Sequence, residues 1–157
     1  MTALAIPGQY LTFHLKQQCY GVPIGHVREI NRFTEITPVP QTPSFVAGVM
    51  NLRGKVIPVV DLRVKFGLEI AKQTKNTCII VIDSDSGHVG MIVDFVSGVI
   101  DLTSEQIEPT PEVGDAKKLR HVTGMAKVNA TVLILIDIAL ALSAEELTET
   151  YTIQNSA

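Results

Sequence analysis

The sequence has no tryptophan, and aromatic residues make up only 5% of its 157 positions, although 46% of the residues are hydrophobic. A chain of this length forms one ordinary domain or two very small ones, and it buries about 68–70% of its unfolded surface. The core must therefore be built from aliphatic side chains. Valine and isoleucine dominate this set, and because both residues favour extended backbone, the composition predicts a mainly β fold.

Cysteine is scarce too, with only Cys19 and Cys78 in the chain. Their spacing matches no metal or redox motif, so we expect two buried free thiols rather than a disulfide. The four histidines have no metal-ligand spacing, and the segment that begins at Asp83 departs from a calcium loop at its fifth and sixth positions, Gly87 and His88. We therefore predict no metal site.

Neither sign of charge is in excess, since 13 basic residues stand against 16 acidic ones, a net charge of −3. This balance argues against a nucleic-acid surface and against an anionic membrane surface. No apolar run reaches the length of about 18 residues that a membrane span needs. The N-terminal segment lacks the basic start and the apolar length of a secretion signal. We expect a soluble cytoplasmic protein without direct membrane insertion.

The signatures of common active sites are also missing. The sequence has no glycine-rich phosphate loop and no G-x-S-x-G elbow, and serines in predicted turns, such as Ser84 and Ser97, have no evident base. It accordingly predicts no catalytic residue and no cofactor. An enzyme working at a seam between two modules stays open as an alternative, without a catalytic constellation to support it.

The most informative segment that is present covers residues 51–62. Arg53-Gly54 is typical of a tight turn, because glycine can take positive φ. The β-branched run at 56–60 predicts a strand, in which Pro58 cannot donate to a ladder and so indicates an edge or a bulge. Residues 62–66 then predict one or two helical turns, stopped by a glycine.

Two further short helices are expected. Pro23 precedes aliphatic residues at 24, 27 and 30, a spacing that predicts a helix-like crossover. A capping box at 143–146 predicts a C-terminal helix, and residues 148–157 should fray after it.

An internal repeat divides the chain into two halves. The matching positions share residue type or chemical class at offsets of 69, 71 and 76 residues: Tyr20-Gly21-Val22 with Val89-Gly90-Met91, the prolines at 38–40 with those at 109–111, and Gly48 and Asp61 with Gly124 and Asp137. Such drift is what insertions between two copies of one module produce. Five short strands per half predict a small barrel built twice, over 9–69 and 70–147, with terminal strands able to cross over. Because a barrel of about 70 residues is marginal alone, the two should share an apolar seam.

With the preceding Gly48-Val49, residues 51–63 form the pattern NLRG-K-VIPVVDLR, which resembles the signature of the CheW family. The likeness covers roughly residues 9–147 and includes Val27-Arg28-Glu29-Ile30 and the segment 89–94. Membership would imply two tandem five-stranded SH3-like β-barrels. It would also imply a scaffold, or adaptor, of bacterial chemotaxis signal transduction that couples chemoreceptors to the histidine kinase CheA.

The resemblance further implies a receptor-binding groove between the barrels. Its expected residues come from both halves: Val27, Glu29, Ile30, Asn51, Leu52, Arg53, Val89, Val96 and Val99. A helical hairpin at the cytoplasmic tip of the chemoreceptor would dock there. The regulatory domain of CheA would bind by barrel-to-barrel contact, at residues that the sequence does not identify.

The resemblance would place the protein in the cytoplasm, recruited to receptor arrays at the inner membrane. A CheW-like adaptor of a non-flagellar pathway, such as one for surface motility, stays open as an alternative because one fold can serve several pathways.

Overall fold

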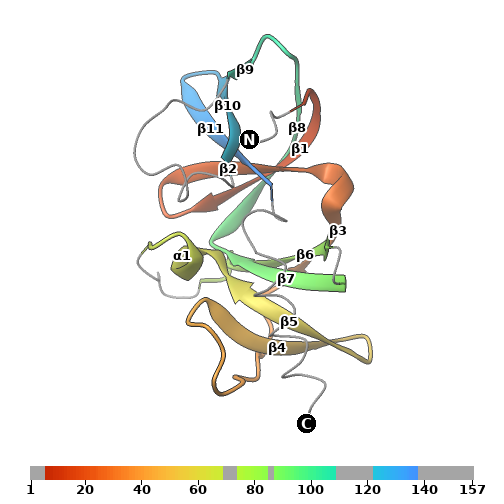
Figure 1. Cartoon of the computed structure of the whole chain (residues 1–157). Coiled ribbons are helices and arrows are strands. Elements are labelled where there is room, and N and C mark those ends of the chain that lie inside the picture. Colours follow the sequence, from red (N-terminus) through yellow and green to blue (C-terminus); the bar gives the residue numbers. More distant parts are fainter. Residues whose placement is uncertain (1–5, 69–73, 85–86, 109–121, 138–157) are drawn as a thin grey trace.

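The structure is a computed structural model, and it describes residues 6–68, 74–84, 87–108 and 122–137. These residues form two β-sheets, drawn in the upper and lower halves of Figure 1. The six-stranded sheet has the order β8 (Phe95–Leu102), β1 (Gly8–Leu15), β2 (Gln18–Pro23), β11 (Thr131–Ile136), β10 (Val122–Val128) and β9 (Ile107–Glu108). The five-stranded sheet has the order β3 (Val27–Arg32), β6 (Cys78–Ser84), β7 (Gly87–Val93), β5 (Lys55–Asp61) and β4 (Val46–Leu52).

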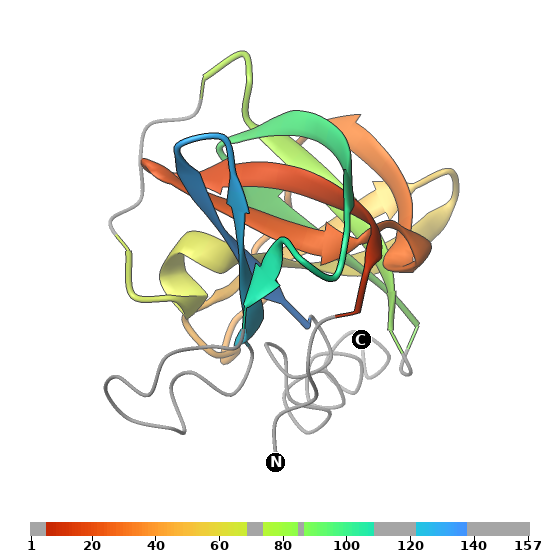
Figure 2. The ribbon, with the colours of Figure 1, turned by 90° about the horizontal axis from the view of Figure 1, so that it is seen from above.

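This arrangement confirms the mainly β fold with two sheets. The strands of the six-stranded sheet curve strongly when seen from above (Figure 2), which is consistent with a small barrel. Two short helices accompany the strands in the described ranges: the 3₁₀ helix η1 (Ile24–His26) and the α-helix α1 (Leu62–Lys65). The expected C-terminal helix and the frayed tail at 148–157 lie outside the described residues.

Each sheet takes strands from both halves of the sequence. The β1–β2 hairpin belongs to the sheet that otherwise contains strands of the second half, and the β6–β7 hairpin joins the strands of the first half. Two reciprocal parallel pairings produce this exchange, β5 with β7 and β11 with β2. A boundary between residues 69 and 70 therefore does not coincide with the boundary between the sheets.

The pairing register reproduces the repeat in three dimensions. Val59 pairs with Gly90, and Leu135 pairs with Gly21. Leu135 is the repeat equivalent of Val59 at an offset of 76 residues, and Gly90 is that of Gly21 at an offset of 69, so the same pairing occurs twice. A Cβ atom added at Gly90 would lie 2.9 Å from Cγ2 of Ile79, and one at Gly21 would lie 3.1 Å from Cδ2 of Leu135. The repeated glycines are therefore needed where the exchanged hairpins pack against the neighbouring strands.

The bulges repeat as well. The ladder between β3 and β6 shifts register between Val27 and Glu29. The ladder between β1 and β8 shifts register between Val96 and Gly98, which are the equivalent residues of the second half. Bulges aim side chains as well as bending strands. The repeat therefore conserves the direction of side chains on the two edge strands β3 and β8.

Three hydrophobic clusters fill the described part of the molecule. The first, here called the seam, contains residues of both sheets, among them Leu11 and Phe13 of β1 and Ile82 of β6. Its existence agrees with the predicted apolar seam. The other two lie within single sheets, around Val59 and Val81 in one and around Leu102 and Leu135 in the other. Truncating a fully buried aliphatic side chain in such a cluster typically costs about 2–5 kcal/mol.

Two local predictions need correction. Only Ile24–His26 is helical in the expected crossover, because Val27–Arg32 pairs with β6 as a strand. The prediction that Pro58 marks an edge strand or a bulge is also wrong, since β5 lies between β4 and β7 and its register is regular at Pro58. Pairing of β5 with β7 begins only at Val59, so no hydrogen bond to β7 is required from Pro58.

Candidate functional site

The arginine turn is the two-residue loop of the β4–β5 hairpin. Arg53 has φ of 50° and Gly54 has φ of 88°, which is the pattern of a type I′ turn. Oδ1 of Asn51 accepts a hydrogen bond of 2.9 Å from the backbone N–H of Gly54. In the equivalent β10–β11 hairpin Asn129 takes the positive φ, and asparagine tolerates this conformation better than arginine does. The first hairpin therefore keeps a side chain that its backbone does not favour.

Arg53 forms a bidentate ion pair with Glu29 of β3. Nη1 lies 2.9 Å from Oε2 and Nη2 lies 2.7 Å from Oε1. The Arg53 side chain is 74% exposed and that of Glu29 is 23% exposed. Hydrogen bonding to Arg53 lowers the pKa of the Glu29 carboxyl, and the same bonds raise the pKa of Arg53. Because β3 and β4 are the two edges of the five-stranded sheet, the pair links one edge to the hairpin at the other.

The bulge at Arg28 divides the predicted residues of β3 between two faces. Val27 pairs with Ile82, which belongs to the seam, whereas Glu29 pairs with Val81, which belongs to the cluster inside the five-stranded sheet. Paired residues on neighbouring strands point to the same face. Val27 therefore lies on the seam side, and Glu29 lies on the side of the arginine turn.

The predicted aliphatic wall is only partly at the surface. Ile30 is 44% exposed and Val99 is 51% exposed, on the edge strands β3 and β8. Val27 and Val96 are half-buried and both pack against the seam. Val89 is completely buried within the seam, so its expected position on the groove wall is corrected to the core.

Asn51 and Leu52 accompany Arg53 on the hairpin, as expected from the signature. Leu52 is half-buried and packs against the cluster inside the five-stranded sheet, while Asn51 is exposed. The structure thus brings Glu29, Leu52 and Arg53 together on one side of that sheet.

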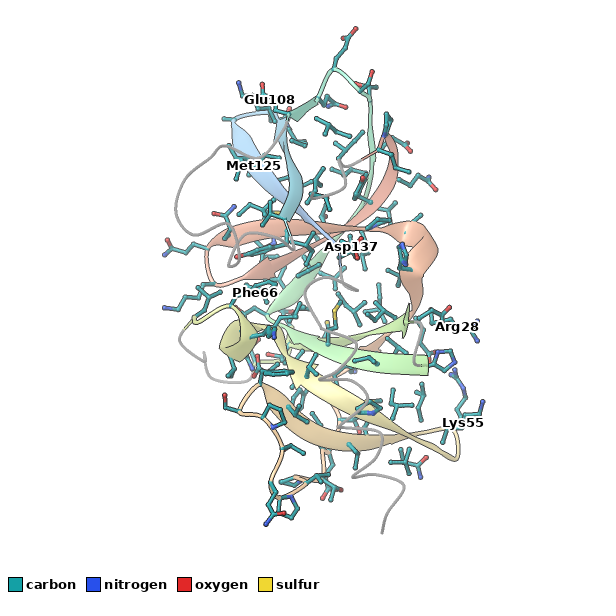
Figure 3. All side chains as sticks on the ribbon, viewed as in Figure 1. Arg28, Lys55, Phe66, Glu108, Met125 and Asp137 are labelled. Atoms are coloured by element: carbon teal, nitrogen blue, oxygen red, sulfur yellow. The ribbon has the colours of Figure 1, made fainter. Side chains whose placement is uncertain are left out.

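A pocket of about 170 Å³ opens beside the ion pair, here called the basic pocket. Four of its six lining side chains are of basic residue types, namely Arg28, Arg53, Lys55 and His88, and the other two are Leu52 and Ile57. Figure 3 shows Arg28 and Lys55 along the same edge of the molecule. Arg28, Lys55 and His88 were not predicted to belong to the site, because they come from the three strands β3, β5 and β7, whose neighbourhood depends on the sheet order.

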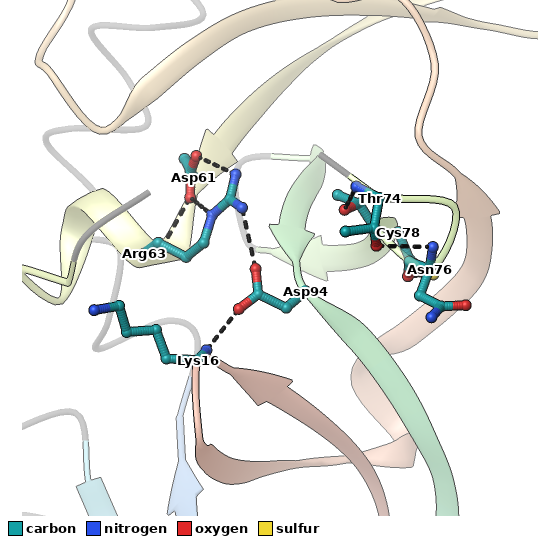
Figure 4. A network of polar contacts seen from close by, with 8 residues as sticks. Lys16, Asp61, Arg63, Thr74, Asn76, Cys78 and Asp94 are labelled. Atoms are coloured by element: carbon teal, nitrogen blue, oxygen red, sulfur yellow. Dashed lines mark hydrogen bonds and ion pairs between the residues drawn. The ribbon is translucent and has the colours of Figure 1, made fainter. Parts of the chain in front are cut away.

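A second polar cluster is buried at the start of α1 (Figure 4). The Arg63 guanidinium donates to both carboxylate oxygens of Asp61, at 2.9 Å each, and to Oδ1 of Asp94 at 3.0 Å. Hydrogen bonding to Asp61 raises the pKa of Arg63. Asp61 also caps α1 by accepting the backbone N–H of Arg63. Asp61 and Arg63 are both buried, which favours a structural role for the cluster.

The described ranges contain no group of three or more acidic, histidine or cysteine side chains placed to hold a metal ion. Cys19 and Cys78 are free, as predicted, and both are half-buried. Burial raises the pKa of the Cys19 thiol, which disfavours the reactive thiolate. None of the helices in these ranges has the length and apolar character needed to span a membrane.

The fold and the site define a protein of two β-sheets that exchange a hairpin with each other. It presents an arginine–glutamate ion pair and exposed aliphatic residues at the sheet edges. A family model described as a CheW-like domain matches residues 9–146. The chain belongs to the CheW family, and it is an adaptor of bacterial chemotaxis.

Individual relatives agree with this assignment. The chemotaxis protein CheW of Klebsiella aerogenes is 40% identical over 139 residues, which cover 88% of this chain and 84% of that protein. Protein FrzA of Myxococcus xanthus is 33% identical, with 82% of this chain and 81% of that protein covered. The crystal structure of the scaffolding protein TtCheW from Thermoanaerobacter tengcongensis superposes with a TM-score of 0.80 at 34% identity, covering 90% of this chain and 96% of that one.

Proposed function

We propose that this adaptor couples chemoreceptors to the histidine kinase CheA as a scaffold without catalytic activity. The observation that carries the proposal is the ion pair between the exposed Arg53 of the β4–β5 hairpin and the half-buried Glu29 of β3. A non-glycine residue with positive φ costs of order 1 kcal/mol or more, and such strain concentrates at functional sites. Arg53 is held in this conformation with its guanidinium at the surface, where it is available to a partner.

The receptor would dock along the edge strands beside this pair. Ile30 and Val99 expose aliphatic surface, and the half-buried Val27 and Val96 continue it towards the seam. An apolar surface bordered by a charged pair suits the amphipathic face of a helix. The cytoplasmic tip of a chemoreceptor, a helical hairpin, is the partner that we assign to this surface.

The kinase would bind elsewhere on the barrels. We infer contact with the regulatory domain of CheA, a CheW-like double barrel, through barrel surfaces away from the arginine turn. Holding receptor and kinase in one geometry would let the receptor's signalling state change the kinase autophosphorylation rate. The adaptor would then act in the cytoplasm, recruited to receptor arrays at the inner membrane.

Co-sedimentation tests this proposal directly. Membranes that carry a chemoreceptor should pull down the wild-type chain, and CheA should appear in the pellet only when the adaptor is present. Membranes from the same strain without the receptor serve as the control. If the adaptor pellets equally with both membranes, or if CheA pellets without it, the coupling role is wrong.

A second candidate, an adaptor of a non-flagellar chemosensory pathway, is compatible with the likeness to FrzA. Deletion of the gene separates the two candidates. Loss of swimming chemotaxis with normal surface spreading supports the first candidate, and the reverse result supports the second.

A further inference from the structure

The basic pocket carries more positive charge than its internal partners neutralise. Arg53 is paired with Glu29 at 2.7 Å. Nε of Arg28 lies 3.8 Å from Oδ1 of Asp83. Lys55 has no ion-pair partner within residues 6–68, 74–84, 87–108 and 122–137, and its side chain lines the pocket. Three cations therefore face two carboxylates before any charge on the histidine is counted.

The histidine of the pocket shares one of these carboxylates. Nδ1 of His88 lies 2.7 Å from Oδ1 of Asp83, the same oxygen that faces Arg28. Asp83 and His88 are opposite each other in the β6–β7 ladder, so the hairpin holds them together. Asp83 is thus divided between two basic side chains, which leaves the ammonium of Lys55 as the cation able to accept a further anionic partner.

The size and the floor of the pocket limit what it can hold. Ligand pockets for drug-sized molecules measure about 300–1,000 Å³, whereas this one measures about 170 Å³. The floor includes Leu52 and the buried Ile57. An apolar floor below a cationic rim fits a single side chain that has a short aliphatic stem and a carboxylate end.

The geometry points to a specificity pocket for one glutamate or aspartate side chain of the docked receptor hairpin, with Lys55 as its principal charge partner. This inference rests on the proposed function, because Arg53 belongs both to the receptor site and to the wall of the pocket. A carboxylate placed there would bring the net charge of the pocket close to neutral. It would fix which residue of the receptor helix lies beside the arginine turn, since charge complementarity sets the register of an interface.

A double-mutant cycle tests the inference. The probe is the purified cytoplasmic hairpin of a chemoreceptor, in wild-type form and with each tip Glu or Asp changed singly to Gln or Asn. Lys55→Gln should weaken binding of the wild-type hairpin about threefold to tenfold, in the range of charge pairs at partly desolvated interfaces. For one of the neutralised hairpins Lys55→Gln should cause almost no further loss, which is the expected coupling.

Lys127→Gln is the control, because Lys127 lies on the equivalent β10–β11 hairpin and the variant loses the same charge outside the pocket, at an exposed ion pair with Glu108. It should leave affinity unchanged. Absence of coupling with every tip carboxylate, or an equal loss in Lys127→Gln, would overturn the pocket while leaving receptor binding itself intact. Inorganic phosphate that binds in a Lys55-dependent manner, without coupling to the receptor, would assign the pocket to a small anion instead. Failure of the wild-type chain to bind the hairpin at all would overturn the proposed function and this inference with it.

Discussion

Arg63 and Asp94 form an ion pair between two segments that lead into different sheets, with Nη1 3.0 Å from Oδ1. Arg63 belongs to α1, directly after β5 of the five-stranded sheet. Asp94 lies between β7 and β8, and its second oxygen accepts the backbone N–H of Lys16 at 2.6 Å, in the β1–β2 turn of the six-stranded sheet. One carboxylate thus ties α1 to a turn of the other sheet.

Arg63→Met should destabilise the protein strongly. Removing one partner of a buried ion pair typically costs about 3–5 kcal/mol, because the remaining charges lose their compensation. Here the buried Asp61 and the mostly buried Asp94 would both be left without the guanidinium. Urea denaturation measures the free energy of unfolding. Arg53→Met, at an exposed arginine, is the control and should stay within about 0.5 kcal/mol. A loss below about 1 kcal/mol for Arg63→Met would show that water replaces the guanidinium.

A chain that ends at residue 69 should not fold cooperatively. It would keep β3, β4 and β5 but lose β6 and β7, the two strands between β3 and β5 in the five-stranded sheet. Its β1–β2 hairpin would also lose β8 and β11 as partners. Circular dichroism during thermal unfolding should show a broad transition without a baseline. Mixing the two separately produced halves should restore a sharp transition, and a half that unfolds cooperatively alone would contradict the role of strand exchange.

The repeat could be predicted from the sequence, and so could the possibility that terminal strands cross over, but the sequence did not identify which hairpins are exchanged. Gly21 and Gly90 were recognisable as a repeated pair, and a Cβ atom at either position would lie within 3.1 Å of a neighbouring side chain, Leu135 for Gly21 and Ile79 for Gly90. The same strand pattern would, however, arise if each hairpin stayed in its own barrel. Which sheet receives a hairpin is decided by packing in the seam between distant segments, and this packing has no local signature.

The residues of the candidate site could be proposed from the resemblance, whereas the contacts between them could not. Glu29 and Arg53 were both assigned to it, and the structure adds the ion pair between them. Val89, which the resemblance placed on the groove wall, is completely buried because it pairs with Ile82 inside the seam. The ion pair of Arg63 with Asp94 could not be predicted from the sequence, since the two residues lie 31 positions apart.

The carboxyl of Glu29 should titrate below its ordinary value of 4.5. Hydrogen bonds from Arg53 are the main cause of the lowered pKa, since they stabilise the charged form. The pair therefore contributes its stability above the unfolded-state pKa of glutamate, and this contribution is lost as the pH falls through the lowered folded-state value. Carbon-detected NMR titration of the side-chain carboxyl measures the pKa. In Arg53→Ala it should move upward, and an unchanged value would show that the ion pair is not populated in solution.

Arg53→Ala should abolish receptor coupling while leaving the fold intact. The side chain is 74% exposed, so its removal should change the free energy of unfolding by no more than about 0.5 kcal/mol. At the centre of an interface, truncation of an arginine can cost about 2 kcal/mol or more, roughly thirtyfold in affinity. Thermal unfolding and co-sedimentation with receptor-bearing membranes measure the two effects separately. Binding of CheA should persist, because the kinase uses other surfaces in the proposed arrangement.

Two further variants distinguish the side chain of Arg53 from the turn that carries it. Arg53→Gly removes the guanidinium but suits a φ of 50°, so it should be at least as stable as Arg53→Ala and equally defective in coupling. Arg53→Lys keeps the charge but loses the bidentate geometry towards Glu29, and we expect intermediate coupling. If Arg53→Gly couples receptors normally, the arginine is not part of the receptor site. If Arg53→Ala unfolds the protein, the residue stabilises the hairpin, and its exposed side chain is not a contact for the receptor.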